Sequence, residues 1–495
     1  MRRAKLRPCH RFPRQAASWT LAALLALPAG GAAQEEPGDA AAPEEAAATA
    51  GGGKEGLIPA EIDRPAPEQD LQAIYRLARQ ADRGLAAERS RRRAADEGVD
   101  QAIAQFLPQI SASGGYEDLK TTYPESDQRP DLDTQGWDAT LSLTQPVFRR
   151  GYFVELERSR STAEQADIEL SLAEQQLVVD VTQAYFDVLL AQDELALVET
   201  ELEAVESQLR RAERALEVGT GTQTDVDEAQ ATFDQVRAER VAAQNQLDIA
   251  RESLRRIIGQ YPGELAGLEA GFEPQPVEPS GTEHWVETAR RYNLEVQLAA
   301  QQEQVARHDV DAQRADRWPQ VEIEGQYSYS DKEQDQFFGT TTQTFDEPSD
   351  TRSIRLQVSM PLFTGGGITS RVQQAEAQRT AAAEELADQR RAAALDARSA
   401  YLNLRSERER VRALEQALVS ARSNEAAVRR GQQVGTRTIT DVLNAQSQRF
   451  ETKRNLAEAR YNYLTSFVQL QAAAGMAVDE DVIREVNAQL QAVAP

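Results

Sequence analysis

Apolar residues recur at alternating steps of three and four through one long stretch of this 495-residue chain, from about Arg149 to Val218. Seven of them form an uninterrupted series: Leu195, Val198, Leu202, Val205, Leu209, Ala212 and Leu216. The stretch contains no proline, and its glycine is confined to Gly151 near the start. This heptad spacing is typical of a left-handed coiled coil. We therefore predict one unbroken helix of roughly 68 residues, about 100 Å long at ~1.5 Å per residue.

Two shorter apolar series flank the long one. They predict helices from about Asp70 to Phe106 and from about Thr224 to Ile258, the second following a turn at Val218-Gly219-Thr220. Each is about half as long as the central helix. Stacked end to end, the two shorter helices would match the length of the long one.

The chain contains an internal duplication with a period of about 216 residues. Matched segments occur in the same order in both halves: Leu107-Pro108-Gln109 and Trp318-Pro319-Gln320, Gln145-Pro146-Val147-Phe148 and Met360-Pro361-Leu362-Phe363, Ala184-Tyr185 and Ala400-Tyr401, Val218-Gly219-Thr220 and Val434-Gly435-Thr436, Thr224-Asp225-Val226 and Thr440-Asp441-Val442, Gly259 and Gly475. Such a repeat predicts a repeated architecture. We expect a second long helix with a seam at Val411, Leu414 and Leu418, and short helices at about Glu283 to Arg317 and Thr440 to Ala474.

Between the first short helix and the long helix of each half, the apolar period changes to two. Val321, Ile323, Tyr327 and Tyr329 alternate with polar residues, as do Ile354, Leu356 and Val358 on the return. The first half shows a weaker version at Ala139, Leu141 and Leu143. Period two predicts strands with one apolar and one polar face, so each half carries one β-hairpin. We expect strands of about nine residues, which fits small soluble hairpins and also the ~9 to 11 residues that a tilted strand needs to cross a bilayer.

The remaining segments complete the domain organisation. Arginines and one lysine precede an apolar run from Ala16 to Leu27 and then small residues, which is typical of a secretory signal peptide. The run is too short for a membrane-spanning helix, which needs ~20 apolar residues. We assign 1–33 to the signal peptide, 34–67 to a disordered acidic leader, 68–259 to the first repeat, 260–282 to a link, 283–475 to the second repeat and 476–495 to a short C-terminal tail.

Composition excludes several functions. The only cysteine, Cys9, precedes the apolar run and would leave with the signal peptide, and His284 and His308 are the only histidines after it. We find no motif for a nucleophile, a cofactor or a metal, so we expect no catalytic residues and no enzyme. The formal charge is −25, and loss of six positive charges with residues 1–33 makes it −31. Such a chain would repel nucleic acid.

The strands require more than one copy of the chain if they lie in lipid. An open sheet edge leaves backbone polar groups unsatisfied in hydrocarbon, so the sheet must close. The smallest membrane barrels have eight strands, and one chain offers four. A head-to-tail ring of two or three copies would close the sheet and gather the long helices below it.

The region from about Asp70 to Gly475 resembles the TolC family of outer-membrane efflux and secretion channels. The resemblance rests on Leu107-Pro108-Gln109, on Gln145-Pro146-Val147-Phe148 and on the two turns at Val218-Gly219-Thr220 and Val434-Gly435-Thr436. It implies a mainly α protein with a transmembrane β-barrel: a homotrimer whose 12-stranded barrel continues into a 12-helix tunnel across the periplasm. The implied partners are outer-membrane lipid, a periplasmic adaptor protein and an inner-membrane pump. The acidic leader and the short tail depart from the family pattern.

The two turns are the first candidate sites. Gly219, Thr220, Gly435 and Thr436 lie where coiled helices reverse direction. Helix termination alone accounts for them, because glycine accepts the left-handed conformation that ends a helix and threonine is a good cap, here expected at Thr224 and Thr440. The resemblance implies that the same turns also contact the adaptor.

The second candidate site is a gate. Asp225 and Asp441 fall in the first turn of their helices, where the helix dipole favours a carboxylate. The resemblance places Asp441 at the narrow entrance of the channel, and Asn444 stands where a second acidic residue is expected. It also implies a latch that joins Arg437 to Asp225, and a contact from Thr224 to the position of Gln432.

Two other classes compete with the channel interpretation. An enzyme lacks the necessary residues. A soluble periplasmic coiled-coil scaffold, or an adaptor protein, would suit the heptads but has no need of four amphipathic strands. We therefore predict a passive export duct for efflux, type I secretion or both, gated at its periplasmic end. The sequence leaves the cargo, the pump and the gating trigger open.

Overall fold

The computed structural model describes residues 69–123, 131–268, 272–338, 341–476 and 480–488. The predicted signal peptide at 1–33 and the acidic leader at 34–67 lie outside the described residues. The described residues all belong to one compact unit, residues 63–495. Helix dominates this unit, as the composition predicts.

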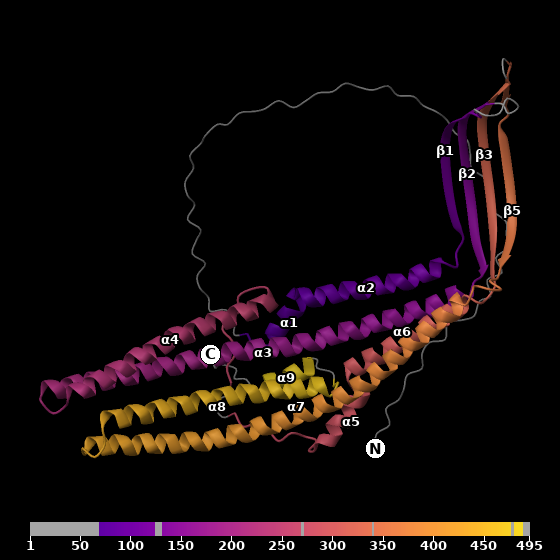
Figure 1. Ribbon diagram of the computed structural model, residues 1–495. Helices are drawn as coiled ribbons and strands as arrows, with labels where there is room; N and C mark the ends of the chain where they lie inside the picture. Colours follow the sequence, from indigo (N-terminus) through magenta and orange to yellow (C-terminus); the bar gives the residue numbers. More distant parts are fainter. Residues whose placement is uncertain (1–68, 124–130, 269–271, 339–340, 477–479, 489–495) are drawn as a thin grey trace, which may run out of the picture. The chain divides into compact units, whose positions relative to one another are not determined.

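Two very long helices confirm the heptad analysis. α3 spans Arg150–Glu217 and α7 spans Gly367–Gln433, with 68 and 67 residues. α3 packs along α4 (Gln223–Ile258), and α7 packs along α8 (Ile439–Ala473), as Figure 1 shows. The predicted seam is the buried face, where Val198 and Val205 of α3 meet Ala229 and Val236 of α4. α3 and α4 also pack against α8, so the two halves form one body.

The prediction of a single helix before each strand pair is wrong, because each is interrupted once. In the first half the chain forms α1 (Leu71–Ala81) and α2 (Arg83–Ala104). In the second half it forms α5 (Thr282–Tyr292) and α6 (Leu294–Ala315). Asp82 and Asn293 separate the helices with extended ψ angles of 124° and 128°. Their short polar side chains accept hydrogen bonds from the next helix, Asp82 from the N–H of Leu85 at 2.6 Å, which makes the break favourable.

The breaks lie where the returning helices end. Gly475 follows α8 with φ 70°, and a Cβ at this position would lie 2.2 Å from the carbonyl carbon of Tyr292, next to the break at Asn293. Gly259 ends α4 with φ 76°, and a Cβ at this position would lie 3.2 Å from the Cβ of Ala81, next to the break at Asp82. α2 and α4 both pack on α3, and α6 and α8 both pack on α7. The stacking of two short helices along each long one is therefore confirmed.

The strands form one antiparallel sheet in the order β1-β2-β3-β5, with β4 pairing the far end of β3. Their bounds are β1 Gln109–Thr121, β2 Asp131–Phe148, β3 Gln320–Phe338, β4 Thr341–Asp346 and β5 Ser349–Ser359. The expected length of nine residues is wrong: β2 and β3 have 18 and 19 residues. Pairing continues past the alternating segment because backbone N–H and C=O groups pair whatever the side chain, as between Trp137 and Asp331.

Two prolines lie near the junctions of strand and helix. Pro361 follows the end of β5. Pro146 lies inside β2, two residues before its end, and the β2–β3 register shifts there. After Pro361, Gly365 and Gly366 adopt φ of 60° and 84°, and Gly366 is the residue before α7. A left-handed conformation at both positions turns the chain from the sheet into the long helix.

The apolar strand residues have large exposed areas. Ile354 of β5 is 88% exposed, and Leu356 and Val358 on the same face are also exposed. In the part of the chain that the structure describes, β1 pairs only with β2, and β5 only with β3. Among the same residues, no helix is both long and apolar enough to cross a membrane. The sheet thus presents an apolar face and two free edges.

The C-terminal segment contains a helix that the sequence analysis missed. Within the predicted tail at 476–495, α9 spans Glu480–Asn487 and buries Ile483 and Val486. Asn487 accepts a hydrogen bond from the N–H of Leu71 at 3.1 Å and donates one to Asp70 at 2.9 Å. The segment therefore packs on the start of α1 and joins the two ends of the described chain.

Candidate functional site

The two helical turns have the same geometry. Gly219 and Gly435 adopt φ of 73° and 80°. The N–H of Thr220 donates to the carbonyl of Ala215 at 2.8 Å, and the N–H of Thr436 donates to that of Gly431 at 2.9 Å. These bonds satisfy carbonyl groups at the helix end while glycine takes the left-handed conformation. The residues predicted to contact an adaptor therefore also terminate α3 and α7.

The predicted caps at Thr224 and Thr440 are wrong, because the caps lie two residues earlier. Thr222 accepts from the N–H of Asp225 at 3.2 Å, and Asp225 accepts from the N–H of Thr222 at 2.9 Å. Thr438 and Asp441 repeat this reciprocal pair at 3.1 and 2.9 Å. In such a capping box the threonine stands three residues before the acid, a spacing that identifies the cap among two neighbouring threonines.

Thr224 and Thr440, which are not the caps, have different surroundings. Thr224 lies in the first turn of α4, one residue before Asp225. The Thr440 hydroxyl, in the first turn of α8, donates to Glu228 of α4. This bond joins the two helical hairpins near their turns. It is a contact that neither helix alone predicts.

The capping box fixes the charge of Asp441. Hydrogen bonds from the backbone N–H and hydroxyl of Thr438, with the positive charge of Arg437, hold the pKa of Asp441 below its ordinary value. Asn444 follows one turn later on α8 and is exposed. The predicted entrance residues therefore carry one ionised carboxylate and one amide per chain on adjacent turns.

A cavity of about 410 Å³ lies between the two turns. Its lining comes from both hairpins and includes Thr220, Asp225 and Arg437 of the predicted sites, and Gln432. Gly219, Gly435, Thr436, Thr224, Asp441 and Asn444 are not part of the lining. The structure thus brings the two residues of the predicted latch, Arg437 and Asp225, to one cavity. In the described part of this single chain they form no ion pair, and the Asp225 carboxylate bonds to Thr222 instead.

Buried charges between and within the helical hairpins were missed by the sequence analysis. Glu201 of α3 is 3% exposed, and its carboxylate lies 3.7 Å from Arg454 of α8. Burial raises its pKa to about 7, against the opposing effect of Arg454. A second buried acid, Glu425 of α7, pairs with Arg449 of α8 at 2.6 Å and with Arg429 at 2.7 Å. Paired burial avoids the large cost of an isolated buried charge.

A sequence signal for Glu201 exists in retrospect. Glu194, Glu201 and Gln208 are spaced by seven, so they share one face of α3 beside the apolar seam. A polar heptad stripe is usually a solvated face. Here α8 covers it, and the helix that covers a stripe depends on long-range packing.

A second polar contact joins α3 to α8, further from the turns than Glu201 and Arg454. The hydroxyl of Tyr461 donates to Asp193 at 2.7 Å. Burial raises the pKa of both groups, and for Tyr461 the neighbouring charge of Asp193 acts in the same direction. Tyr461 also stacks near Phe186 in the main core. The contact therefore connects the two hairpins inside a cluster of buried hydrophobic residues.

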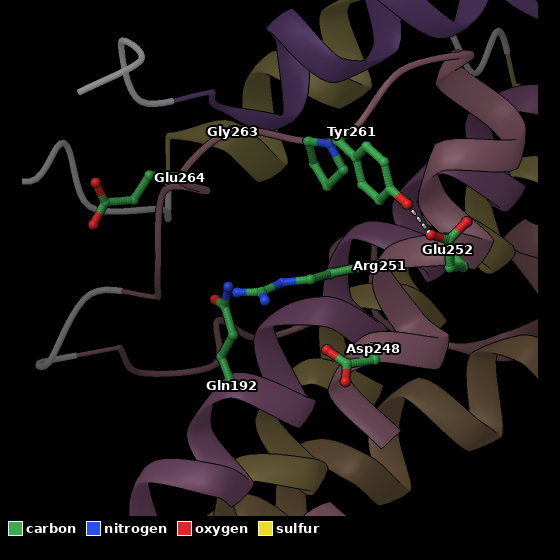
Figure 2. Close-up of a pocket in the computed structure, with 8 residues that line it drawn as sticks. Gln192, Asp248, Arg251, Glu252, Tyr261, Gly263 and Glu264 are labelled. Carbon is green, nitrogen blue, oxygen red and sulfur yellow. Dashed lines mark hydrogen bonds between the residues drawn. The ribbon is translucent and has the colours of Figure 1, made fainter. Parts of the chain in front are cut away.

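Another cavity, of about 700 Å³, lies beside the link and is shown in Figure 2. Tyr261 of the link donates its hydroxyl to Glu252 of α4, and Arg255 lies over the Tyr261 ring at 4.2 Å. The lining is polar with both signs of charge, including Asp248 and Arg251. Across the described ranges no cluster of His, Cys, Asp or Glu could hold a metal ion. These contacts fasten the link to α4.

Comparison with known proteins identifies the class. A solved structure of CusC superimposes with a TM-score of 0.70 at 16% identity, covering 86% of this chain and 99% of that one. The fold is therefore that of the outer-membrane channels. The family model described as outer membrane efflux protein matches residues 74–260 and 285–476. This chain belongs to the outer membrane efflux protein family, whose members are transport ducts, and it is an outer-membrane channel protein.

Two relatives extend the comparison. The outer membrane protein TolC of Vibrio cholerae serotype O1 is 34% identical over 423 residues, which cover 86% of this chain and 94% of that protein. The alkaline protease secretion protein AprF of Pseudomonas aeruginosa is 29% identical over 385 residues, covering 77% of this chain and 79% of that protein. The resemblance to the TolC family is thus confirmed over most of the chain.

Proposed function

We propose that three copies of this chain join head to tail to form a passive export duct for efflux, type I secretion or both. The observation that carries this proposal is the sheet with free edges at β1 and β5. β4 and β5 both pair with β3 and occupy one strand position, so each chain supplies four positions. Three copies give a closed barrel of 12 strands, which removes the edges. Their helical rods then give a 12-helix tunnel in the periplasm.

A soluble scaffold or adaptor is not favoured. It leaves the exposed apolar face of β5 in water, including Ile354 and Leu356. In a lipid-facing barrel the same residues lose their contact with water, at ~25 cal/mol per Å² of apolar surface.

We assign gating to the ends of the two hairpins. Arg437 and Asp225 line the same cavity, and we propose that these groups from neighbouring subunits latch the closed end. Thr224 contacts a neighbour in the same state, and Asp441 with Asn444 forms the narrow entrance. The exposed turns at Gly219, Thr220, Gly435 and Thr436 receive the helical hairpin of a periplasmic adaptor bound to an inner-membrane pump.

Gene deletion tests the function most directly. Loss of this chain raises sensitivity to dyes and toxic compounds if it serves efflux, and abolishes export of a secreted protein if it serves type I secretion. Complementation with the unchanged gene restores either phenotype. If fractionation yields a soluble periplasmic monomer, or if deletion changes neither phenotype, the proposal fails.

Cysteine labelling tests the position of the turns. The chain's single cysteine lies within the predicted signal peptide, so Thr220→Cys or Thr436→Cys introduces a unique thiol into the rest of the chain. We expect cross-linking of these thiols to an adaptor protein in intact cells. Ser171→Cys on α3, far along the helix from the turn, is the matched control. Equal cross-linking at Ser171→Cys would remove the support for a docking site at the turns.

A further inference from the structure

An aromatic cluster lies where β2 passes into α3 (Figure 1). Its rings belong to Phe148, Phe153, Phe106 and Tyr152, whose successive centroids are 6.4, 5.0 and 6.0 Å apart. Phe148 pairs with Val321 of β3, and directly paired residues of an antiparallel sheet lie on the same face. Val321 also pairs with a residue of the exposed apolar face of β5, which is Val358. The aromatic cluster therefore continues that apolar face at the helical end of the sheet.

Two arginines lie beside the aromatic cluster. The guanidinium of Arg149 lies over the Tyr152 ring, 4.9 Å from its centroid, and donates to the Tyr152 hydroxyl at 3.0 Å. Arg150 is the next residue and begins α3, and both arginines are exposed. Among the residues that the structure describes, neither forms an ion pair with a carboxylate, whereas Arg158 further along α3 pairs with Glu155 at 3.2 Å. Two positive charges without counter-ions thus lie next to an exposed apolar surface.

The fold does not require these arginines. The N-terminus of a helix disfavours positive side chains, so they do not stabilise the start of α3. In the duplication Phe148 corresponds to Phe363, which makes Thr364 and Gly365 the counterparts of Arg149 and Arg150. The chain passes from β5 into α7 there without either charge. A bound anion accounts for the arginines of the first half, and the construction of the junction does not.

The aromatic cluster lies away from the proposed contacts between subunits. β2 has β1 and β3 beside it, and α3 has α2 and α6 beside it, all from the same chain. Closure of a ring through the edges at β1 and β5 therefore leaves the cluster uncovered. In the proposed duct the strands lie in lipid and the helices in the periplasm, so the junction lies at the periplasmic leaflet. Aromatic side chains with polar or charged neighbours are typical of this boundary between lipid and water.

We propose that Arg149 and Arg150 bind the headgroup phosphate of an anionic phospholipid in the periplasmic leaflet, and that the aromatic cluster contacts its glycerol and upper acyl chains. This lipid site depends on the proposed function, because it requires the strands to lie in lipid. Guanidinium groups bind phosphate oxygens through paired hydrogen bonds. The contact with Tyr152 fixes the direction of the Arg149 guanidinium before the lipid binds.

The apolar part of the site selects a lipid over a soluble anion. Inorganic phosphate would engage the arginines alone and leave the exposed ring of Phe153 in water, whereas a phospholipid covers both. A net negative headgroup fits better than a zwitterionic one, because the choline of a zwitterionic lipid brings a third positive charge to two that have no counter-ion.

Lipid binding to the purified full-length channel tests the site. Native mass spectrometry from detergent micelles measures the bound fractions of dioleoyl-phosphatidylglycerol and dioleoyl-phosphatidylcholine, offered at equal concentrations. We expect the wild type to prefer phosphatidylglycerol roughly tenfold or more, since each basic residue near an anionic lipid contributes about fivefold. Arg149→Gln with Arg150→Gln should remove most of this preference. An excess of inorganic phosphate should leave the phosphatidylglycerol bound.

Two further variants control for charge and for folding. Arg237→Gln with Arg256→Gln removes two exposed arginines of α4 and should leave the lipid preference unchanged. Arg149→Lys with Arg150→Lys keeps both charges and should keep part of the preference, which separates lipid binding from a fault in folding.

The outcomes separate the lipid site from the duct. A wild type without preference, an equal preference in the glutamine variant of Arg149 and Arg150, or displacement of the lipid by inorganic phosphate would each refute the lipid site and leave the duct intact. Purification of the chain as a monomer that stays in solution without detergent would refute the duct.

Discussion

Glu201 of α3 and Arg454 of α8 lie 3.7 Å apart in the interior between the two helical hairpins, where Glu201 is almost fully buried. The acidic side chains of Glu194 and Glu239 lie around the same arginine and line a cavity of about 310 Å³ with it. One arginine thus faces three carboxylates. The pair links the two halves of the duplication. Protonation of Glu201 changes the net charge around Arg454.

We expect the free energy of unfolding to fall as pH rises through the titration range of Glu201. Burial raises the pKa of folded Glu201 to about 7, above the ordinary value of 4.5. A group with a raised folded pKa contributes stability fully below its unfolded pKa and loses it as pH rises through the folded pKa. Relative to Glu201→Gln, the wild type should therefore lose on the order of 2 kcal/mol between pH 4.5 and pH 8. Thermal unfolding of the detergent-solubilised protein measures the difference.

The control for this prediction is Glu199→Gln. Glu199 forms an exposed ion pair with Arg240 at 3.0 Å, and such pairs contribute only ~0 to 1 kcal/mol. Its removal should leave the pH dependence unchanged. A parallel pH profile for Glu201→Gln and the wild type would contradict the assignment.

Arg437→Ser should open the channel. Loss of the guanidinium removes the proposed latch with Asp225. In the proposed trimer, three such contacts of roughly 0.5 kcal/mol each would shift the equilibrium between closed and open forms about tenfold. Single-channel recording in planar bilayers should show larger conductance or longer openings. Arg430→Ser, in the last turn of α7 and outside the cavity lining, should behave as the wild type. Unchanged conductance in Arg437→Ser would exclude the latch.

Gly475→Ala should destabilise the protein more than Gly219→Ala does. Both glycines have left-handed φ angles, 70° and 73°, so both substitutions carry the same backbone strain of about 1 kcal/mol. At Gly475 the new Cβ would also lie 2.2 Å from the carbonyl carbon of Tyr292, whereas nothing lies within 4 Å at Gly219. We expect about 2 to 4 kcal/mol for Gly475→Ala. Equal melting temperatures of the two variants would show that the helix ends do not abut.

Thr222→Ala should loosen the start of α4, and Thr224→Ala should not. The first substitution removes the side chain that accepts from the N–H of Asp225 at 3.2 Å, at a cost of about 1 kcal/mol. Hydrogen exchange of the backbone N–H groups in the first turn of α4 measures this effect. The exchange should be faster than in the wild type only in Thr222→Ala. Faster exchange in Thr224→Ala alone would instead support the sequence-based prediction that Thr224 is the cap.

The regular elements were largely predictable because their signals are local. The seam of α3, the reversal at Gly219 and the alternation around Tyr327 each depend on spacing within one segment. The interruption at Asp82 was not predicted, because an aspartate also occurs inside helices, and its role as a cap here is seen only in the bond from the N–H of Leu85. The strand lengths were not predicted either, since the outer residues of β2 and β3 pair through the backbone and leave no pattern in their side chains.

The candidate site was predictable only in part. The turns and the first-turn acids follow from glycine, threonine and aspartate at fixed spacing, although the spacing to Asp225 selects Thr222 rather than Thr224 as the cap. The cavity that joins Arg211 to Arg437 required the structure, because the two residues are on different hairpins. The same holds for Thr440 and Glu228, and for Glu201 and Arg454.

The sequence by itself determined the rods, the turns and the duplication, because a helix and its period are encoded by residues a few positions apart. Only the tertiary structure decided which polar faces are buried and which arginines share a cavity. Burial and charge at a residue depend on what the rest of the chain places against it. Arg454 beside Glu201, and Arg437 in the cavity with Arg211, both come from the other half of the duplication.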